Sequence, residues 1–246
     1  MKKTMLALAI AALSPVAAQA DLLFTVGAKA SIWAADPSGQ LDDGVSTGSD
    51  GLNLKGENGD QITLYFEHPL PMIPNVQLKK TSLSVTGNGT VNVNFNNQAF
   101  NGDVHSKLDV SHTDYTLYWG LPIPFVDINF GLTGRKFAGS ASVASSSQTE
   151  SVDIDLMLPM AYGAVSISTP FGVYASADIN YIALGDNKLS DISYGLGYNL
   201  PVPVVDLGLE AGYRKMKMAT DPDDTDVELD VDLKGMYYGL ALSVGF

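Results

Sequence analysis

Apolar and polar residues alternate along most of the chain with a period of two, which is typical of β-strands that present one apolar face. The residues between the apolar positions are mostly Gly, Ala, Ser and other polar types, so the second face carries little apolar volume. The pattern is clearest in the last nine residues, where the apolar face consists of Tyr238, Leu240, Leu242, Val244 and Phe246.

Proline clusters such as Leu121–Pro124 break these segments, because proline cannot donate to a sheet ladder. Four short connections of this kind alternate with five longer polar ones, at 36–60, 88–106, 138–150, 185–189 and 219–228. An even number of strands places both chain ends on one side. The ten predicted strands are Leu22–Trp33, Gln61–Glu67, Val76–Gly87, Asp109–Gly120, Val126–Phe137, Val152–Ser168, Phe171–Leu184, Ser190–Leu200, Val204–Met218 and Leu229–Phe246.

Three predicted strands depart from regular alternation. The third changes parity around Lys79 and Lys80, the sixth contains Pro159, and the last changes parity near Gly235. A β-bulge, or the rise of a strand above a membrane, accounts for a change of parity. Eight strands therefore remain an alternative to ten.

Composition narrows the fold class. The net charge is −13, which argues against nucleic-acid binding, and the chain has no cysteine for disulfides or thiolate metal sites. After the first twenty residues, no uninterrupted apolar run is long enough for a membrane helix. Half-apolar strands with short turns and long loops predict an all-β, antiparallel transmembrane β-barrel. A soluble β-protein with aromatic residues over its core is the alternative.

The first twenty residues have the features of a secretory signal peptide. Lys2 and Lys3 precede the apolar run Met5–Ala12, and Ala18-Gln19-Ala20 fits a cleavage site after Ala20. An N-terminal membrane anchor is the alternative, although the apolar run is short for a spanning helix. The barrel domain is thus predicted to comprise residues 21–246.

The alternating C-terminal strand with its terminal Phe246 resembles the C-terminal signature of Gram-negative outer-membrane β-barrel proteins, in the size range of OmpA-type or OmpW-type barrels. The resemblance implies recognition of Tyr238, Leu240, Leu242, Val244 and Phe246 by the barrel-assembly machinery. It also implies residence in the cell outer membrane, in contact with lipid and lipopolysaccharide. The short turns would then be periplasmic and the long loops extracellular.

The face opposite the apolar one collects ionisable residues, which must pair or contact water because exposure to lipid would cost a few kcal/mol each. They form either a salt-bridged plug or a hydrated, cation-favouring pore. The predicted lumen charges are Lys29, Asp114, Asp127, Arg135, Asp178, Asp206, Glu210 and Arg214, together with Glu67, Asp153, Asp155 and Asp191.

Two groups of residues suggest further chemistry. His112 and Asp114 on the fourth strand, with Asp153 and Asp155 on the sixth, could activate water in an arrangement that resembles the omptin proteases, although no omptin motif surrounds them. The acidic run Asp221–Glu228 could bind Ca²⁺ or contact lipopolysaccharide through divalent cations, or could simply be solvated. The favoured interpretation is a non-enzymatic membrane structural protein or narrow porin-like channel, without a cofactor. An omptin-like hydrolase is the alternative.

Overall fold

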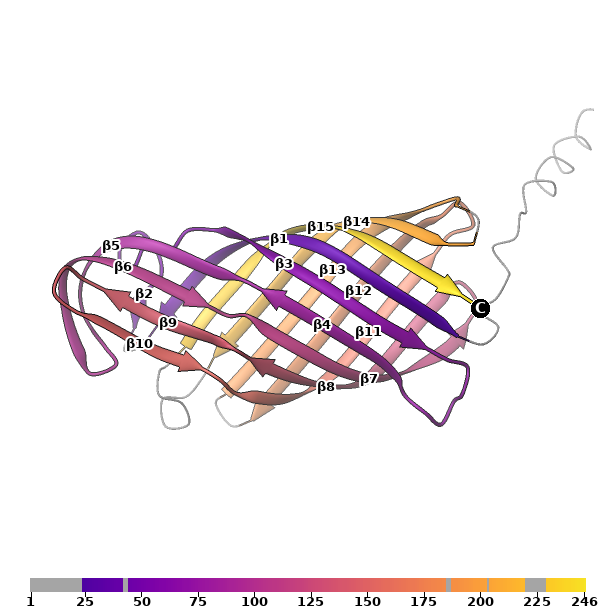
Figure 1. Ribbon diagram of the computed structural model, residues 1–246, viewed down its shortest axis with the longest axis horizontal. Helices are drawn as coiled ribbons and strands as arrows, with labels where there is room; N and C mark the ends of the chain where they lie inside the picture. The colour runs from indigo at the N-terminus through magenta and orange to yellow at the C-terminus, as the bar shows by residue number, and fades with distance from the viewer. Residues whose placement is uncertain (1–23, 42–43, 185–186, 203, 220–228) are drawn as a thin grey trace, which may run out of the picture.

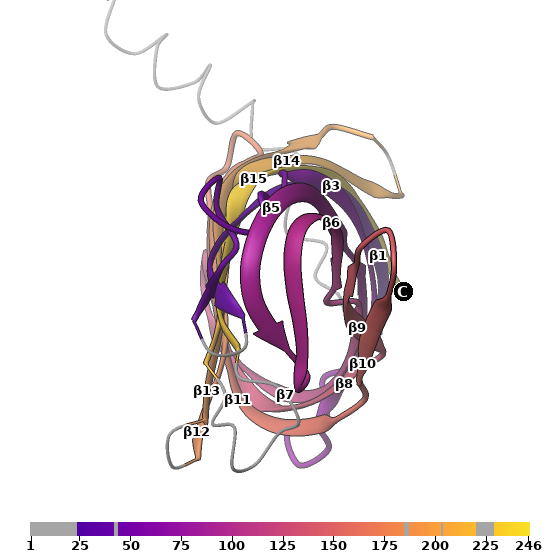
Figure 2. The same cartoon turned by 90° about the vertical axis from the view of Figure 1, so that its left-hand side faces the viewer.

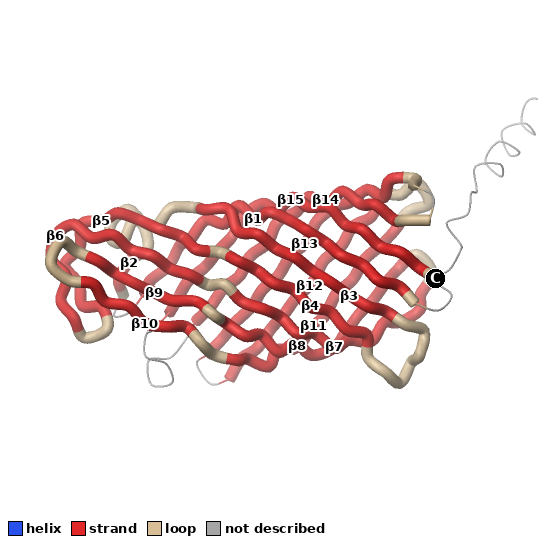
Figure 3. Tube along the Cα trace, viewed as in Figure 1, coloured by secondary structure: helices blue, strands red, loops and turns tan. Residues whose placement is uncertain are grey.

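The computed structural model describes residues 24–41, 44–184, 187–202, 204–219 and 229–246. The predicted signal peptide, residues 1–20, and the acidic run Asp221–Glu228 lie outside the described residues. Within the described residues there is no helix that could cross a membrane. Regular structure in this part of the chain consists of β-strands (Figure 3).

Ten antiparallel strands form a closed barrel, which confirms the predicted number and excludes the alternative of eight. Each pairs with its neighbour in the barrel, and β15 pairs with β1 to close the cylinder (Figure 1). In order around the wall the strands are β1 (Thr25–Leu41), β3 (Glu57–Glu67), β4 (Asn75–Ser82), β7 (His112–Ile123), β8 (Val126–Phe137), β11 (Met157–Ser168), β12 (Val173–Leu184), β13 (Asn187–Leu200), β14 (Asp206–Ala219) and β15 (Leu229–Gly245).

The seam of the barrel is closed by the first and last described residues. The amide of Phe24 donates to the carbonyl of Phe246, and the amide of Phe246 donates back, both at 3.0 Å. This end of the barrel, called the terminal end below, also carries the short turns between β7 and β8 and between β11 and β12. Phe125, in the β7–β8 turn, has a φ of 65°.

At the opposite end, four barrel strands continue beyond brief interruptions into a second sheet, called the far wall below. It comprises β5 (Ser84–Phe95), β6 (Gln98–Asp109), β9 (Gly139–Ala144) and β10 (Thr149–Ile154), in the order β10-β9-β6-β5. These strands are in front when the molecule is viewed from the far end (Figure 2). The prediction of loops at 88–106 and 138–150 is therefore wrong.

The β5–β6 hairpin turns on Asn96 and Asn97, whose φ angles are 49° and 61°. Two consecutive left-handed residues form a tight turn whose twist matches that of the flanking strands, and asparagine tolerates this conformation well. The connection between β1 and β3 packs beside this hairpin and includes β2 (Val45–Ser46). Leu54 forms a bridge with Gly87 of β5. The far wall is thus joined to the barrel as one structure.

The apolar face of the barrel wall changes from the outside to the inside partway along the barrel axis. Near the terminal end, large apolar side chains point outward, including Leu132 and Leu196, which are 66% and 64% exposed. Towards the far end, Val231 and Leu233 point inward and are fully buried. The strand register between β14 and β15 is continuous from Asp206 to Ala219, so no bulge lies near Gly235. Of the two explanations for the parity change, the rise of a regular strand above the apolar belt is correct.

The apolar core fills the far half of the barrel and the space behind the far wall. Its side chains come from the barrel strands, the β1–β3 connection and all four far-wall strands. The larger fully buried members are Trp33, Leu52, Leu83, Phe95, Phe100, Leu108, Phe137, Met160, Met216 and Leu233. The outward positions in β5 are polar instead, namely Asn88, Thr90, Asn92 and Asn94. This half therefore has the polarity of a water-soluble β-protein.

Candidate functional site

A cavity of about 870 Å³ extends into the lumen from the terminal end and is called the vestibule below. At its mouth it is lined by Pro69 and Leu70 from the β3–β4 connection, and it reaches inward to Arg214. Inward-facing polar positions of the barrel strands line its wall, as period-two alternation requires. Its tyrosines are Tyr65, Tyr118, Tyr162, Tyr174 and Tyr237.

Most carboxylates along the vestibule have partners. Glu210 accepts hydrogen bonds from Lys29, at 2.8 Å, and from the Tyr174 hydroxyl, at 2.7 Å. The Tyr118 hydroxyl donates to Glu67 at 2.7 Å, which ties β7 to a residue two strands away. The vestibule wall is therefore a fixed hydrogen-bonded surface and not a ring of free negative charges.

Asp178 lies deeper in the same cavity. It accepts a hydrogen bond from the Ser193 hydroxyl and lies 3.7 Å from Lys79 Nζ. These contacts place a second lysine and carboxylate in the inner part of the vestibule.

A row of buried charged residues crosses the lumen where the vestibule ends; it comprises Asp114, Arg135, Asp191, Arg214 and His112 and is called the charged row below. Arg135 donates to both carboxylate oxygens of Asp114, each at 2.7 Å, and to Asp191 at 2.6 Å. Arg214 makes a second two-point contact with Asp191, at 2.8 and 2.6 Å. Two arginines and two aspartates thus neutralise each other.

The charged row reaches from one side of the barrel to the other. Arg214 on β14 lies 3.3 Å from Nε2 of His112 on β7, and four strands separate β14 from β7 in either direction. Arg214 also donates to the Thr81 hydroxyl on β4, at 3.2 Å. Its guanidinium lies 4.5 Å from the ring centroid of Trp33, a cation–π geometry. These bonds brace opposite walls against each other.

Hydrogen bonding fixes the protonation of His112. Its Nδ1 lies 2.8 Å from the carbonyl oxygen of Val110, which can only accept, so Nδ1 carries a proton. Nε2 faces the Arg214 guanidinium, which can only donate, so Nε2 carries the lone pair. His112 is therefore neutral in this arrangement and adds no charge to the row.

The charged row is fully enclosed, with exposed fractions of 2% or less for all five side chains. On its far side, Arg135 donates to the sulfur of Met216 at 3.4 Å, and the apolar core begins there. Enclosed ions are costly to desolvate and are tolerated only with good geometry and further hydrogen bonds, which both arginines have. Among the described residues, the cavity that enters the lumen from the terminal end thus stops at this row.

The predicted lumen charges occupy three places. Lys29, Asp178 and Glu210 line the vestibule, and exposed Asp127 lies nearer its mouth. Asp114, Arg135 and Arg214 belong to the charged row, as does Asp191. Asp206 begins β14 and is exposed at the terminal end. The C-terminal residues Tyr238, Leu240, Leu242 and Phe246 are exposed on the outside of β15, and Val244 is partly exposed.

The residues suggested for hydrolysis are not brought together. His112 and Asp114 are buried in the lumen, whereas Asp153 and Asp155 are exposed and flank the inward-facing, buried Ile154. Because neighbouring strand residues point to opposite faces, both aspartates lie on the outer surface. The prediction that they face the lumen is wrong.

Ligand atoms of His112, Asp114 and Asp191 lie within 4.8 Å of one another, a spacing that could suit a metal ion. Arg135 and Arg214 already supply the positive charge at these carboxylates. The donor set therefore serves an ion-pair network and not a cation cage.

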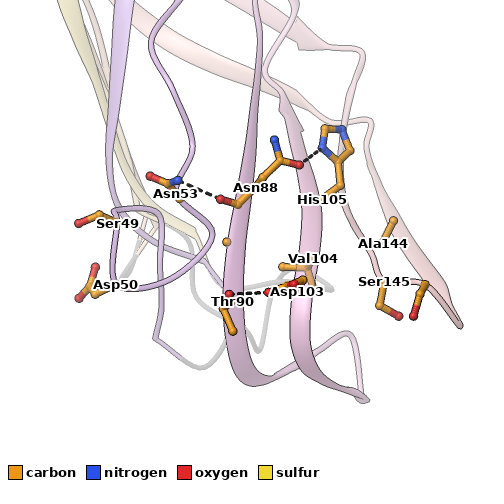
Figure 4. Close-up of a pocket in the computed structure, with 12 residues that line it drawn as sticks. Ser49, Asp50, Asn53, Asn88, Thr90, Asp103, Val104, His105, Ala144 and Ser145 are labelled. Carbon is orange, nitrogen blue, oxygen red and sulfur yellow. Dashed lines mark hydrogen bonds between the residues drawn. The ribbon is translucent and has the colours of Figure 1, made fainter.

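A shallow surface cavity of about 770 Å³ lies at the far end (Figure 4). Asn88 bonds there to both Asn53 and His105, at 2.9 and 3.0 Å, while Thr90 donates to Asp103. A hydrogen bond from the Ser46 hydroxyl, with one from a backbone amide, holds the pKa of the Asp50 carboxyl below its usual value. Much of this polar surface is thus bonded to itself.

Comparison with known proteins supports the fold. No protein-family model matches the chain, and no curated protein matches its sequence. The translocator domain of the autotransporter NalP from Neisseria meningitidis is 10% identical with a TM-score of 0.51; the match covers 99% of this chain and 95% of that one. The outer membrane protease OmpT from Escherichia coli is 10% identical with a TM-score of 0.43, over 90% of this chain and 97% of that one.

The toluene transporter TodX from Pseudomonas putida is 8% identical with a TM-score of 0.34, over 96% of this chain and 93% of that one. Identities this low give the fold and no function, and only the first TM-score exceeds 0.5. Together with the closed ten-stranded wall and its outward apolar belt, the comparison leads to one conclusion. The chain has the fold of an outer-membrane β-barrel.

Proposed function

We propose that this protein is a non-enzymatic structural barrel of the outer membrane whose lumen does not conduct ions in its resting state. The observation that carries this proposal is the charged row, which joins β7 and β8 to β13 and β14 across the lumen. An ion leaving the vestibule would have to displace buried arginine–aspartate pairs and then cross the apolar core. Both steps are costly in a medium of low polarity.

The barrel would lie with its terminal end in the periplasm and its far wall outside the cell. Outer-membrane barrels have short periplasmic turns and larger extracellular segments, which matches the two ends of this molecule. The outward apolar belt would contact lipid and lipopolysaccharide. The barrel-assembly machinery would recognise the C-terminal strand from Tyr238 to Phe246.

Conductance in a planar lipid bilayer tests the closed lumen. We expect refolded mature protein, with insertion verified by heat-modifiable gel mobility, to give no reproducible current steps. The matched comparison is Arg214→Ala, which removes the bonds to Asp191, His112 and Thr81 but leaves the apolar core, and should produce only brief, irregular leak currents if it still inserts. Steady, ohmic steps from wild-type protein would contradict the proposal.

A narrow, cation-favouring channel is the second candidate. The vestibule supports it, because a wet cavity already enters the lumen and reaches Arg214 from one side. Conduction would require the charged row to move aside. Cation-selective steps from wild-type protein whose selectivity changes in Glu210→Gln would favour this candidate.

Single cysteines can test the proposed orientation, because the chain has none of its own. Asn92 is exposed on the outside of β5, and Met72 is 91% exposed in the β3–β4 connection. A membrane-impermeant maleimide should label Asn92→Cys in intact cells and Met72→Cys only after the outer membrane is opened. The reverse pattern would contradict the orientation.

A further inference from the structure

The exposed lysines on the outside of the barrel lie near one border of the apolar belt. Six occupy outward positions where the outer surface changes from apolar to polar towards the far end. In the described residues at the terminal border of the belt, no lysine or arginine faces outward, since Lys29 points into the lumen. The six are Lys80, Lys136, Lys188, Lys215, Lys217 and Lys234.

These lysines differ in whether they have acidic partners. Lys215 bonds to Asp232 at 2.7 Å, and Lys217 lies 3.3 Å from Asp230, so their charges are balanced. Lys80 and Lys136 form no ion pair with any residue that the structure describes, although the protein as a whole carries a net charge of −13. Lys188 and Lys234 form none with the described residues either, so this acidic protein holds four unpaired lysines at the border, of which Lys80 and Lys136 lie closest together in the strand register.

The strand register brings these two lysines into one transverse row. Lys80 on β4 is opposite Thr113 on β7, and Thr113 is opposite Lys136 on β8. Two strand spacings separate the lysine Cα atoms, a distance of about 10 Å. Because outward positions recur every second residue, both ammonium groups and the Thr113 hydroxyl are presented to the same outer surface.

The row lies directly on the edge of the apolar belt. Met157, which pairs with Lys136, is 64% exposed, and Tyr115, the next outward residue of β7, is 53% exposed. A molecule bound here would therefore meet cationic and hydroxyl donors on one side and apolar surface on the other. Asp60 and Asp155 are the next outward residues beyond Ile62 and Met157, which pair with Lys80 and Lys136, but neither aspartate forms an ion pair with these lysines.

We propose that Lys80, Thr113 and Lys136 bind a phosphate group of a phosphorylated glycolipid, the lipid A part of lipopolysaccharide, in the outer leaflet. The inference rests on the proposed orientation in the outer membrane. Ammonium groups bind phosphate through charge-assisted hydrogen bonds, and lysine is a common phosphate ligand. Among the described residues, the outward lysines lie at one border of the belt and not at the other. This asymmetry fits a membrane whose two leaflets differ in phosphate content.

Binding of purified bisphosphorylated lipid A to the refolded protein in detergent tests this site, with native mass spectrometry as the readout. We expect the double variant K80Q/K136Q to bind about tenfold more weakly than wild type, because two charge-assisted contacts are lost. The matched double variant K215Q/K217Q should bind within about twofold of wild type, because those lysines are already paired. Thr113→Val should give a smaller loss than K80Q/K136Q.

Three outcomes would overturn the site. They are equal binding of chemically dephosphorylated lipid A, an equal loss in both double variants, and displacement of lipid A by an equimolar amount of inorganic phosphate. Insertion into phosphatidylcholine vesicles, followed by heat-modifiable mobility, separates this result from the proposed function. Failure of wild type to insert would contradict the membrane assignment, whereas insertion of all variants with unchanged lipid A binding would contradict only the site.

Discussion

At the residue scale, Asp191 links the two arginines of the charged row. Its two carboxylate oxygens accept hydrogen bonds from Arg135 and from two nitrogens of Arg214. It is the acceptor that connects the Arg135–Asp114 pair on β7 and β8 to Arg214 on β14. Its removal would leave a buried guanidinium without a carboxylate, which costs more than the ion pair itself contributes.

We expect Asp191→Asn to lower the free energy of unfolding by about 3–5 kcal/mol, the range for breaking one side of a buried ion pair. Urea titration of the refolded protein in lipid vesicles, followed by tryptophan fluorescence, measures this change. The control is Asp178→Asn, because Asp178 is partly exposed in the vestibule, and it should cost less than about 1 kcal/mol. Equal losses in the two variants would mean that enclosure of the row does not matter.

At the element scale, tyrosine side chains on one strand cover glycines on the next. Tyr174 of β12 is opposite Gly197 of β13, and a Cβ at Gly197 would overlap the Tyr174 ring. Tyr65 covers Gly27 of β1 in the same way. A glycine leaves room for a ring to lie flat along the wall, and this arrangement compensates for the missing side chain. The position of Tyr174 also directs its hydroxyl to Glu210.

We expect Gly197→Ala to destabilise the barrel by about 1–3 kcal/mol, the cost of overpacking. It should also move the Tyr174 hydroxyl away from Glu210. Gly163→Ala is the control, because a Cβ there would meet only Ile179 at an ordinary contact distance of 3.5 Å. The same urea titration measures both variants, and equal stabilities would disprove the packing role of Gly197.

The elements that could be predicted are those whose outward face is apolar. Alternation located ten strands because Ile192, Tyr194 and Leu196 stand out against small or polar neighbours. The far wall was missed because its segments are rich in Asn, Gly and Ser, which favour turns and loops, although Val91, Val93 and Phe95 do alternate with polar residues. The pair Asn96-Asn97 was the available signal for its hairpin.

Alternation also indicated that the charged residues face the lumen, which was wrong only for Asp153 and Asp155. It could not indicate which of them meet, because Arg135 and Asp191 belong to strands that are not neighbours and are 56 residues apart in the chain. Their contact depends on the curvature of the closed wall. For the same reason, alternation could not decide between a salt-bridged plug and a hydrated pore.

At the scale of the whole molecule, one continuous β-wall has outer surfaces of opposite polarity in its two halves. Its belt half exposes apolar side chains and encloses polar ones, and its far half does the reverse, without a change in strand register in β14 and β15. Only the identity of the residues changes along each strand. The choice of outward side chains, and not the backbone geometry, therefore determines whether each half suits an apolar or a polar environment.

We expect a lysine to be tolerated on the outside of one half and not on the other. Leu196→Lys, in the belt, should lower the free energy of unfolding in lipid vesicles by about 2–4 kcal/mol. Asn92→Lys, on the outside of the far wall, should change it by less than about 0.5 kcal/mol. Reversible unfolding in vesicles measures both, and a large loss in Asn92→Lys would show that the far wall also contacts lipid.

The paired hydrogen bonds between Phe24 and Phe246 impose an order on folding. The cylinder closes only when β15 pairs with β1, although hairpins such as β7–β8 can form earlier. Until then β1 has an open edge that could pair with any exposed strand, including one from another copy. Because closure joins opposite ends of the sequence, it requires the longest loop to form and is intrinsically slow. The unclosed barrel therefore needs its β1 edge protected from other strands until β15 has paired with it.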